Sequence, residues 1–467
     1  METDMKTNQL PVAIIGAGPI GLVAAAHLLS IGETPLVFEA GSSVGATVLQ
    51  WGHVRLFSPW RYLLDREAIA FLEASGWLAP DPEAYPTGRE LVERYLVPLA
   101  NNPRVQPHLH LKTRVVAVTR QGVDKMKTPG REQAPFVLRL QTASGEEQDV
   151  LACAVIDASG TYETPNPLGA NGVPARGERA LREHIFYGIP DILGMQRQRY
   201  AGRRVLVVGS GHSAQNALLE LAALAQEHPA THLLWAIRRT DLHQLFGGGE
   251  HDALPARGEL GRRMHALVES GQVRLFTTIH IQALRQTDEG IVIAGEEERL
   301  GPVDEIIATT GFRPDLSLVR ELRLALDVSL ESPVALAPLI DPNVHSCGTV
   351  PPHGVDELSH PEAHFYIVGM KSYGRAPTFL TLTGYEQVRS IVAALTGGWE
   401  AARNVELILP ETGVCSTDTG GSCGLPSTQE VAGQVDDVPA SASCCTPPAR
   451  QLLTVGATSS PAESCCD

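Results

Sequence analysis

A glycine-rich turn near the N-terminus constrains the fold more than any other feature. The stretch PVAIIGAGPIGLVAAAHLLSIGETPLVFEA predicts a short strand, a glycine turn, a helix and a second strand that ends at Glu39. Gly16, Gly18 and Gly21 follow the spacing G-x-G-x-x-G. The first glycine permits the turn, the second lets a pyrophosphate approach the backbone, and the third lets helix and strand pack closely. With an acid placed to hold ribose hydroxyls, this unit predicts a dinucleotide site.

A second unit of the same kind follows in GRRVLVVGSGHSAQNALLELAALAQEHPATHLLWAIRRTDL. Its glycines are Gly209 and Gly211, and Ala214 replaces the third, which still permits close packing. Arg238 and Arg239 stand where the first unit has its acid, and arginines suit the 2′-phosphate of NADP. Either arginine alone is equally consistent with a solvated surface charge. The pair favours NADPH over NADH.

Two dinucleotide sites in one chain imply two nucleotides, and the simplest pair with a purpose is FAD and NADPH. The runs VLACAVIDASGTYETPNP and VDEIIATTGFRPDLS are strand-like and end in small-residue turns at 158–160 and 309–311. Such turns let the chain pass from one nucleotide domain to the other close to the cofactors, although each alone also reads as an ordinary strand exit. The predicted fold class is α/β with two Rossmann-like dinucleotide-binding domains.

Length and charge narrow the partners. A chain of 467 residues exceeds what one hydrophobic core normally serves, so we expect two or more domains. The formal net charge of -16 disfavours nucleic acid and anionic membranes as partners and favours a small molecule. The N-terminal METDMKTNQLP has no apolar signal core, so we expect a cytoplasmic protein with mostly reduced cysteines.

With these motifs in place, the chain from about residue 10 to about residue 395 resembles the flavoproteins with two dinucleotide-binding domains, especially flavin-containing monooxygenases. The resemblance implies an FAD domain at 1–165 and 304–400, an inserted NADPH domain at 166–303 and a flexible cysteine-rich tail at 401–467. It implies FAD contacts at Gly16, Gly18, Pro19, Gly21, Glu39, Gln50, Trp51, Val54, Val115, Ala158, Gly160, Gly369 and Thr383. It implies NADPH contacts at Gly209, Ser210, Gly211, His212, Ser213, Arg238, Arg239, Thr310 and Gly311.

Departures from the relatives bear on the substrate. The stretch HFYIVGMKSYGRAPTFLTLTGYEQVRSIVAAL resembles the last FAD-contacting element, with a helix expected from near Thr383. Related disulfide reductases carry an Asp after its first glycine, where this chain has Met370, and some carry Cys-x-x-Cys in the NADPH domain, which is missing here. The usual monooxygenase fingerprint F-x-G-x-x-x-H is also not cleanly present; the nearest stretch is REHIFYGIPDILG.

Two of the cysteines are predicted in the folded body of the chain, and the others lie in the C-terminal segment. Cys153 lies in an apolar run and is expected to pack in the core, whereas Cys347 lies in a polar Pro-, Gly- and His-rich loop and is the candidate catalytic thiol. His360 and His364 have helical ligand spacing, but Pro361 argues against a helix there, and no metal site is predicted. The remaining thiols, in a segment too polar to order itself, are Cys415, Cys423, Cys444, Cys445, Cys465 and Cys466.

Adjacent thiols on a flexible segment suit the capture of a soft element. Trivalent arsenic is the first candidate, with copper(I), zinc and mercury behind it; a zinc knuckle or chance cysteines are the alternatives. A monooxygenase-like body with such a tail resembles the flavin monooxygenases of arsenic resistance. That resemblance implies oxidation of arsenite or a trivalent organoarsenical by O2 through a C4a-hydroperoxyflavin. Monooxygenation of organic sulfur or nitrogen, NADPH-dependent disulfide reduction and a non-catalytic metalloid sensor stay open as alternatives, as does the oligomeric state.

Overall fold

The computed structural model describes residues 10–240, 245–246, 255–296, 298–344, 350–377 and 379–407. Two parallel sheets organise this part of the chain, and each contains one of the glycine fingerprints. The prediction of an α/β fold with two Rossmann-like units is confirmed. The cysteine-rich segment and Cys347 lie outside the described residues.

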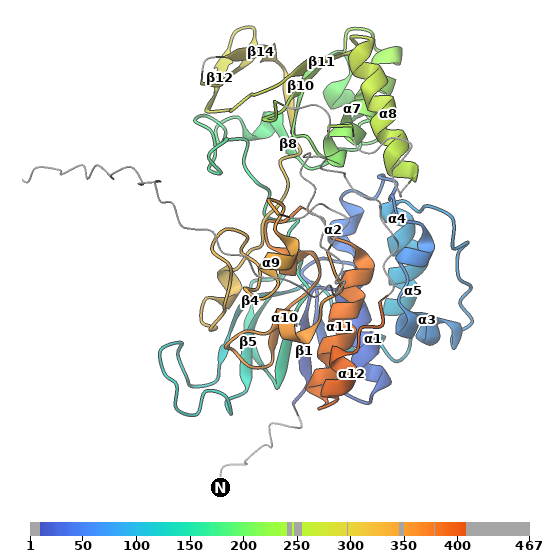
Figure 1. The fold of residues 1–467 in the computed structure, drawn as a ribbon, viewed down its shortest axis with the longest axis vertical. Coiled ribbons are helices and arrows are strands. Elements are labelled where there is room, and N and C mark those ends of the chain that lie inside the picture. Colours follow the sequence, from blue (N-terminus) through green and yellow to red (C-terminus); the bar gives the residue numbers. More distant parts are fainter. Residues whose placement is uncertain are drawn as a thin grey trace, which may run out of the picture. The chain divides into compact units, whose positions relative to one another are not determined.

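The first sheet carries the first fingerprint. Its five strands are parallel and have the order β16-β7-β1-β2-β3. Helices α1 (Pro19–Ser30) and α11 (Thr381–Leu395) pack against each other beside it, as Figure 1 shows in blue and orange. The strands are β1 (Val12–Ile15), β2 (Pro35–Phe38), β3 (Leu109–His110), β7 (Ala154–Asp157) and β16 (Phe365–Ile367). The predicted strand–turn–helix–strand unit is present, and its second strand ends one residue before Glu39.

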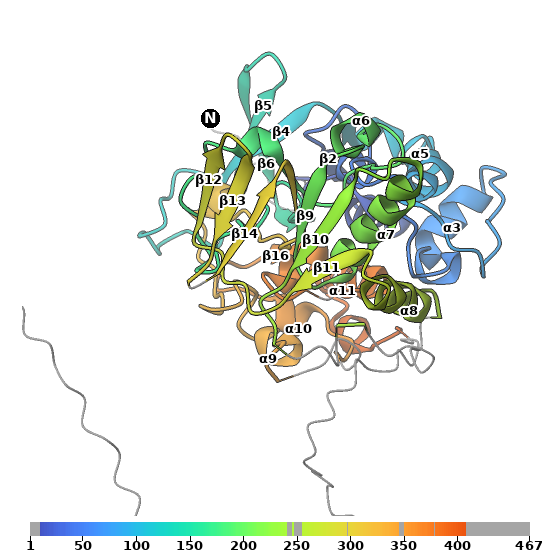
Figure 2. The ribbon, with the colours of Figure 1, turned by 90° about the horizontal axis from the view of Figure 1, so that it is seen from above.

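The second sheet carries the second fingerprint and has the parallel order β11-β10-β9-β15-β8. Helices α7 (His212–Glu227) and α8 (Pro255–Glu269) pack together, and Figure 2 shows them beside β9, β10 and β11. The strands are β8 (Ile185–Tyr187), β9 (Arg204–Val208), β10 (His232–Ala236), β11 (Val273–Phe276) and β15 (Glu305–Ala308). Four consecutive residues at the end of β9 are buried, as a central parallel strand requires.

Each parallel sheet is accompanied by a three-stranded antiparallel sheet. Strand β5 alternates buried and more exposed side chains, the pattern of a sheet with one covered face. The strands of the first are β4 (Thr113–Arg120), β5 (Phe136–Thr142) and β6 (Glu147–Ala152). The strands of the second are β12 (Ala283–Thr287), β13 (Gly290–Ala294) and β14 (Arg299–Val303).

Short helices fill the connections, and their starts follow from local capping residues. Asp65 accepts a hydrogen bond from the Ala68 amide at the start of α3, and Thr87 and Glu90 form a capping box on α4. These helices are α2 (Ala46–Leu49), α3 (Arg66–Glu73), α4 (Gly88–Leu91), α5 (Val97–Ala100), α6 (Arg197–Tyr200), α9 (Ala337–Ile340), α10 (Val355–Leu358) and α12 (Trp399–Arg403). No helix in the described ranges is both long and apolar enough to span a bilayer.

The pairing of β15 bears on the predicted domain boundary at residue 303. The second part of the FAD domain is predicted at 304–400, and within this range β15 pairs with β9 and β8 inside the second sheet. The chain therefore returns to the first sheet only after Ala308. The physical reason is that β15 fills the gap between β9 and β8, so its buried side chains complete the core of that sheet. The domain limits stay predictions.

The chain passes between the two sheets in the segments that follow β7 and β15. These two crossing segments, residues 158–166 and 309–313, contact each other. Asn166 donates from its side chain to the carbonyl of Thr310 at 3.1 Å, and its own carbonyl accepts from the Thr310 hydroxyl at 2.6 Å. The ring of Tyr162 stacks on Phe312 with 4.7 Å between centroids. The segments are thus cross-linked where the chain leaves one sheet and enters the other.

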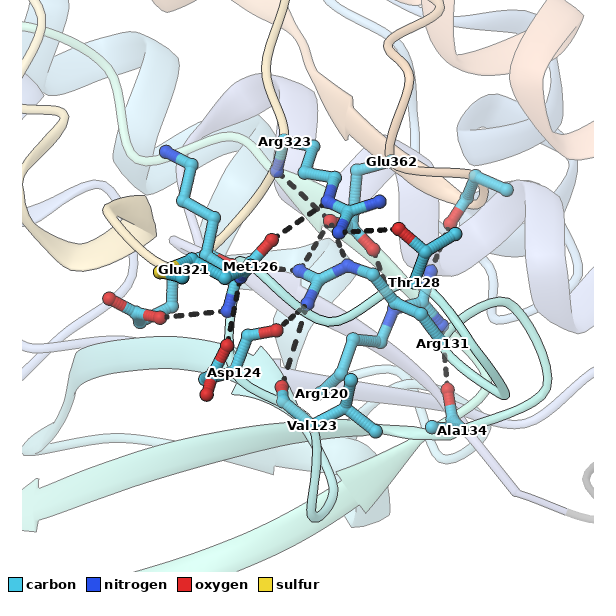
Figure 3. A network of polar contacts seen from close by, with 12 residues as sticks. Arg120, Val123, Asp124, Met126, Thr128, Arg131, Ala134, Glu321, Arg323 and Glu362 are labelled. Atoms are coloured by element: carbon cyan, nitrogen blue, oxygen red, sulfur yellow. Dashed lines mark hydrogen bonds and ion pairs between the residues drawn. The ribbon is translucent and has the colours of Figure 1, made fainter.

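A buried charge network joins β4 and the following loop to the residues before β16 (Figure 3). Glu362 accepts hydrogen bonds from Arg120 Nε at 2.8 Å and from Arg131 Nη2 at 2.6 Å. The second guanidinium of this pair also donates to the carbonyl of Glu321, and the amide of Arg323 donates to the same carboxylate. The network fixes three distant parts of the chain around β16.

Candidate nucleotide-binding site

The three glycines of the first fingerprint have different surroundings. A Cβ on Gly16 would lie 2.8 Å from the Ala158 carbonyl oxygen, and a Cβ on Gly21 would lie 1.9 Å from the carbonyl oxygen of Gly16. A Cβ on Gly18, in contrast, would meet nothing within 4 Å. The first and third glycines are therefore required by packing within the protein, whereas the second borders open space. This is the arrangement that a pyrophosphate needs in order to approach the backbone.

The start of α1 offers hydrogen-bond donors to an anion. Among the described residues, no side chain caps the helix at Gly18, and its first turn contains no acidic residue. The first amides of a helix have no partner within the helix, and its dipole favours negative charge there. The cradle around Gly18 and the donors of α1 together fit a dinucleotide phosphate.

Glu39 lies where the sequence predicts a ribose contact. Its Oε2 accepts from the Ala17 amide at 2.8 Å, and its Oε1 accepts from the Gly41 amide at 2.7 Å. The carboxylate is therefore fixed beside the fingerprint turn at the end of β2. A carboxylate held in this way can also accept hydrogen bonds from two ribose hydroxyls, because its four lone-pair positions are not all used. That contact stays a prediction.

The second fingerprint repeats the first. A Cβ on Gly209 would lie 2.5 Å from the Thr309 carbonyl oxygen, a Cβ on Gly211 would meet nothing within 4 Å, and Ala214 is fully buried. Helix α7 starts after Gly211 with no side-chain cap in the described structure and with no acid in its first turn. Thr309 thus packs on this fingerprint as Ala158 packs on the first one.

The arginines predicted to contact a 2′-phosphate follow β10. Ile237 is buried, and Arg238 and Arg239 are exposed directly after it. Ser210 and Ser213 are half-buried on either side of the start of α7. The predicted NADPH residues 209–213 and the two arginines therefore lie at the carboxyl ends of β9 and β10, whereas Thr310 and Gly311 follow β15, which pairs with β9. This is the edge where parallel sheets bind ligands.

The segment 50–54, which is predicted to contact FAD, leads to a contact with the second fingerprint. Gln50 and Trp51 border α2, Trp51 packs against the core of the first sheet, and Val54 lies in the following turn. Phe57 then contacts the ring of His212, at the start of α7, with 5.3 Å between centroids. These contacts bring residues that follow the first fingerprint against residues of the second.

His53, in the same segment, was not among the predicted residues. Burial lowers its pKa, opposed by the charge of Asp191 and by a hydrogen bond with the Pro190 backbone. Its Nε2 is buried without a hydrogen-bond partner in the described structure. Sequence gave no signal for it, because nothing in the local pattern indicates contact with residues 190 and 191.

The last predicted FAD element meets the start of α1. Gly369 has φ +67°, and a Cβ there would lie 3.0 Å from Cγ1 of Ile20. Thr383, in the first turn of α11, is buried. Val115 is buried on β4 in the core shared with β1. The predicted positions from β16 and α11 are therefore brought beside the first fingerprint, while Val115 lies in the neighbouring layer.

Sequence reasoning also missed a buried ion pair at this edge. Lys371 Nζ lies 2.7 Å from Oδ2 of Asp157, the last residue of β7. Asp157 is directly followed by the turn 158–160, which contains the predicted FAD contacts Ala158 and Gly160. The only signal available in the sequence was an acid at the end of an apolar strand.

The predicted thiols and histidines have different outcomes. Cys347 and the six thiols after it fall outside the described residues. Cys153 packs against the first core, and burial raises its pKa, as a core position predicts. Burial lowers the pKa of His360 to about 4. His364 adopts a left-handed backbone conformation, so the two histidines do not share a helix. Within the described ranges no cluster of three or more potential metal ligands occurs.

Comparisons with known proteins agree with this architecture. The family model described as pyridine nucleotide-disulphide oxidoreductase matches residues 13–335. A relative from Arabidopsis thaliana, flavin-containing monooxygenase FMO GS-OX-like 2, is 23% identical over 343 residues, which cover 67% of this chain and 69% of the relative. Monooxygenase cfoE from Aspergillus candidus is 30% identical over 225 residues, covering 47% of this chain and 34% of that protein.

Solved structures show the same fold at low sequence identity. Bacillithiol disulfide reductase from Bacillus cereus has a TM-score of 0.62 and 19% identity, over 85% of this chain and 99% of its own. Ornithine N-hydroxylase from Kutzneria sp. 744 has a TM-score of 0.54 and 16% identity, over 85% of this chain and 100% of its own.

The family model covers well over half of the chain, and both glycine fingerprints lie within the matched residues. Enzymes of this kind use FAD with NADPH, and the open glycines and uncapped helix starts described above fit those two nucleotides. The chain belongs to the pyridine nucleotide-disulphide oxidoreductase family, as a flavoprotein enzyme similar to the flavin-containing monooxygenases.

Proposed function

We propose that this enzyme is an FAD- and NADPH-dependent monooxygenase that oxidises trivalent arsenic, as arsenite or a trivalent organoarsenical, to the pentavalent form. The observation that carries the proposal is the pair of open glycine sites, one at the start of α1 and one at the start of α7. The similarity to flavin-containing monooxygenases supports the reaction type. The paired thiols of the sequence support a soft substrate.

The reaction balances with O2 as the oxidant. One oxygen atom is added to the arsenic lone pair, the other leaves as water, and NADPH with one proton supplies the two electrons. When bound, FAD supplies the chemistry that joins these reactants. The arsenic atom is already a nucleophile, so the protein needs no general base to activate it.

The chain's own residues then bind and orient. The amides at the start of α1 hold one pyrophosphate, and those at the start of α7 hold the other. Arg238 and Arg239 bind the 2′-phosphate of NADPH. Cys347 holds the arsenical as a thiolate ligand, and the thiols after residue 410 collect it from solution. We place this detoxification in the cytoplasm, where thiols stay reduced.

The test is NADPH consumption together with oxygen uptake by the FAD-loaded protein, with and without arsenite. The proposal expects arsenite to stimulate both rates and arsenate to form in proportion to the oxygen consumed. Repeating the assay with a trivalent methylarsenical identifies which arsenical is preferred. If neither compound changes either rate, oxidation of trivalent arsenic is excluded.

Variants test the role of Cys347 separately from that of the thiols after residue 410. Cys347→Ser should lower the arsenite-stimulated rate, whereas Cys153→Ser, which changes a core thiol, is the matched control and should keep it. A chain that ends at residue 407 should show a raised KM and a nearly unchanged kcat. A truncated chain with an unchanged KM would remove the collecting role from the proposal.

A disulfide reductase is the second candidate, because the likeness of fold to bacillithiol disulfide reductase is strong. Against it, the sequence lacks Cys-x-x-Cys between residues 166 and 303. NADPH oxidation under anaerobic conditions with a disulfide substrate separates the two candidates. Turnover without oxygen favours the reductase, and strict oxygen dependence favours the monooxygenase.

A further inference from the structure

Lys371 and Asp157 form a closed polar cluster with Ser159. The Lys371 Nζ donates to Asp157 Oδ2 at 2.7 Å and to Ser159 Oγ at 2.9 Å. The Ser159 hydroxyl and amide donate to Asp157 Oδ1 at 2.6 and 3.1 Å. The side chains of Lys371 and Asp157 are 1% and 0% exposed. Every oxygen of the carboxylate therefore has a donor, and both charges are excluded from solvent.

A buried ion pair of this kind is a poor way to gain stability alone. Removing two charges from water costs several kcal/mol each, and apolar replacement of both is often neutral or stabilising. Its value must therefore be sought in the geometry it imposes. The pair joins β7 to the 3-10 helix η8 (Gly369–Tyr373), two elements far apart in sequence.

Both joined elements border the first glycine fingerprint. Asp157 and Ser159 flank Ala158, whose carbonyl oxygen contacts Gly16 so closely that a Cβ there would lie 2.8 Å away. The other partner, η8, begins at Gly369, which packs on Ile20 in the first turn of α1. The ion pair therefore holds the turn 158–160 and η8 on the same edge, around the start of α1.

A second set of hydrogen bonds holds the other side of η8. The Gly369 amide donates to Gln387 Oε1 at 2.8 Å, and the Gln387 amide group contacts His353 Nε2 at 2.8 Å. These hydrogen bonds anchor η8 to α11, but they do not reach the turn 158–160. Beside the backbone bond from the Val368 amide to the Asp157 carbonyl at 3.0 Å, Lys371 connects η8 by its side chain to that turn, through Asp157 and Ser159.

We propose that Lys371 is a positioning residue for FAD, which acts through Asp157 and Ser159 by holding the turn 158–160 against Gly16. Lys371 itself needs no contact with the nucleotide in this role. The inference rests on FAD binding at the first fingerprint and is independent of the arsenical substrate, so it stands if another substrate is found.

The experiment is a fluorescence titration of FAD into the apoprotein, at matched folded fraction, for wild type, Lys371→Met and the apolar pair Asp157→Leu with Lys371→Met. The single variant should bind FAD about tenfold more weakly, the equivalent of one hydrogen bond to a charged group. It should also melt at a lower temperature, because Asp157 is left buried and unpaired.

The double variant separates positioning from stability. Since it leaves no unpaired buried charge, its melting temperature should return toward wild type while its FAD affinity stays about tenfold weaker. The absorption maximum of its bound flavin should be shifted, and NADP+ affinity should be unchanged in every variant. If Lys371→Met does not fold, the double variant alone decides.

Two results would overturn the proposal. One is FAD affinity within about twofold of wild type in a folded single or double variant, which is below the effect of a single hydrogen bond. The other is full recovery of both affinity and melting temperature in the double variant, which would make the pair purely structural. Arg139→Met, which breaks an exposed pair with Asp149, is the control and should change none of these quantities.

Discussion

Replacing Glu362 by glutamine tests the buried charge network of Figure 3. Its carboxylate accepts four hydrogen bonds: Arg120 Nε at 2.8 Å, Arg131 Nε at 3.1 Å, Arg131 Nη2 at 2.6 Å and the Arg323 amide at 2.9 Å. Glutamine keeps the shape but removes the charge and turns one acceptor into a donor. Two buried guanidinium groups then face each other without an anion between them.

The cost follows from the burial of all three side chains, which are 2–3% exposed. Removing one partner of such a group costs about 3–5 kcal/mol, because the remaining charges stay buried and uncompensated. At about 2–4 °C per kcal/mol, the melting temperature should fall by about 10 °C. The assay is thermal unfolding followed by circular dichroism at saturating FAD.

The matched control is Asp149→Asn, the same chemical change in an exposed pair with Arg139. An exposed pair contributes at most about 1 kcal/mol, so this variant should melt within about 3 °C of wild type. Burial opposes ionisation of Glu362, but hydrogen bonds from Arg131, Arg323 and Arg120 hold its pKa below the ordinary value. Its contribution is therefore present above pH 4.5 and lost in acid, where wild type and Glu362→Gln should converge. Equal melting temperatures of the two amide variants at neutral pH would refute the reasoning.

Three further predictions concern the fingerprints, the crossing segments and a buried acid. Gly18→Ala should leave the melting temperature of the apoprotein nearly unchanged but weaken FAD binding. Gly21→Ala should destabilise the apoprotein by about 1–3 kcal/mol, because its Cβ would lie 1.9 Å from the Gly16 carbonyl oxygen. Equal stability of the two variants would contradict this reasoning. Asn166→Ala removes the bonds to Thr310 and Arg313 and should cost about 2 kcal/mol in urea unfolding, and a loss below about 0.5 kcal/mol would show that the crossing is held elsewhere. Burial raises the pKa of Glu220 from 4.5 to about 7, so wild type should lose up to about 3 kcal/mol as the pH rises through that range, and melting temperatures against pH should be flatter for Glu220→Gln.

The parts of the fold that sequence predicted are those encoded by short-range spacing. Gly16, Gly18 and Gly21 lie within one turn and the helix that follows, and their different surroundings match the tasks assigned to them. The same holds for Gly209 and Gly211. In both units the constraint is local, because the pattern describes a strand, a turn and a helix that are consecutive in the chain.

The parts that sequence missed depend on contacts between distant residues. Lys371 pairs with Asp157 across 214 positions, and Arg120 pairs with Glu362 across 242 positions. A lone lysine or acid carries no signal of its partner, so neither pair was foreseen. The place of β15 could not be predicted for the same reason, because the strand has only four residues and its position between β9 and β8 is set by pairing.

The two nucleotide sites share more than a sequence pattern. In each, the first glycine packs against a turn of a crossing segment, Ala158 for Gly16 and Thr309 for Gly209. The same two segments then hold each other through Asn166 and through the stacked rings of Tyr162 and Phe312. A short series of direct contacts therefore connects the two fingerprints. Because a side chain at either first glycine would collide with its crossing turn, the glycines serve the junction between the sheets as well as the nucleotides.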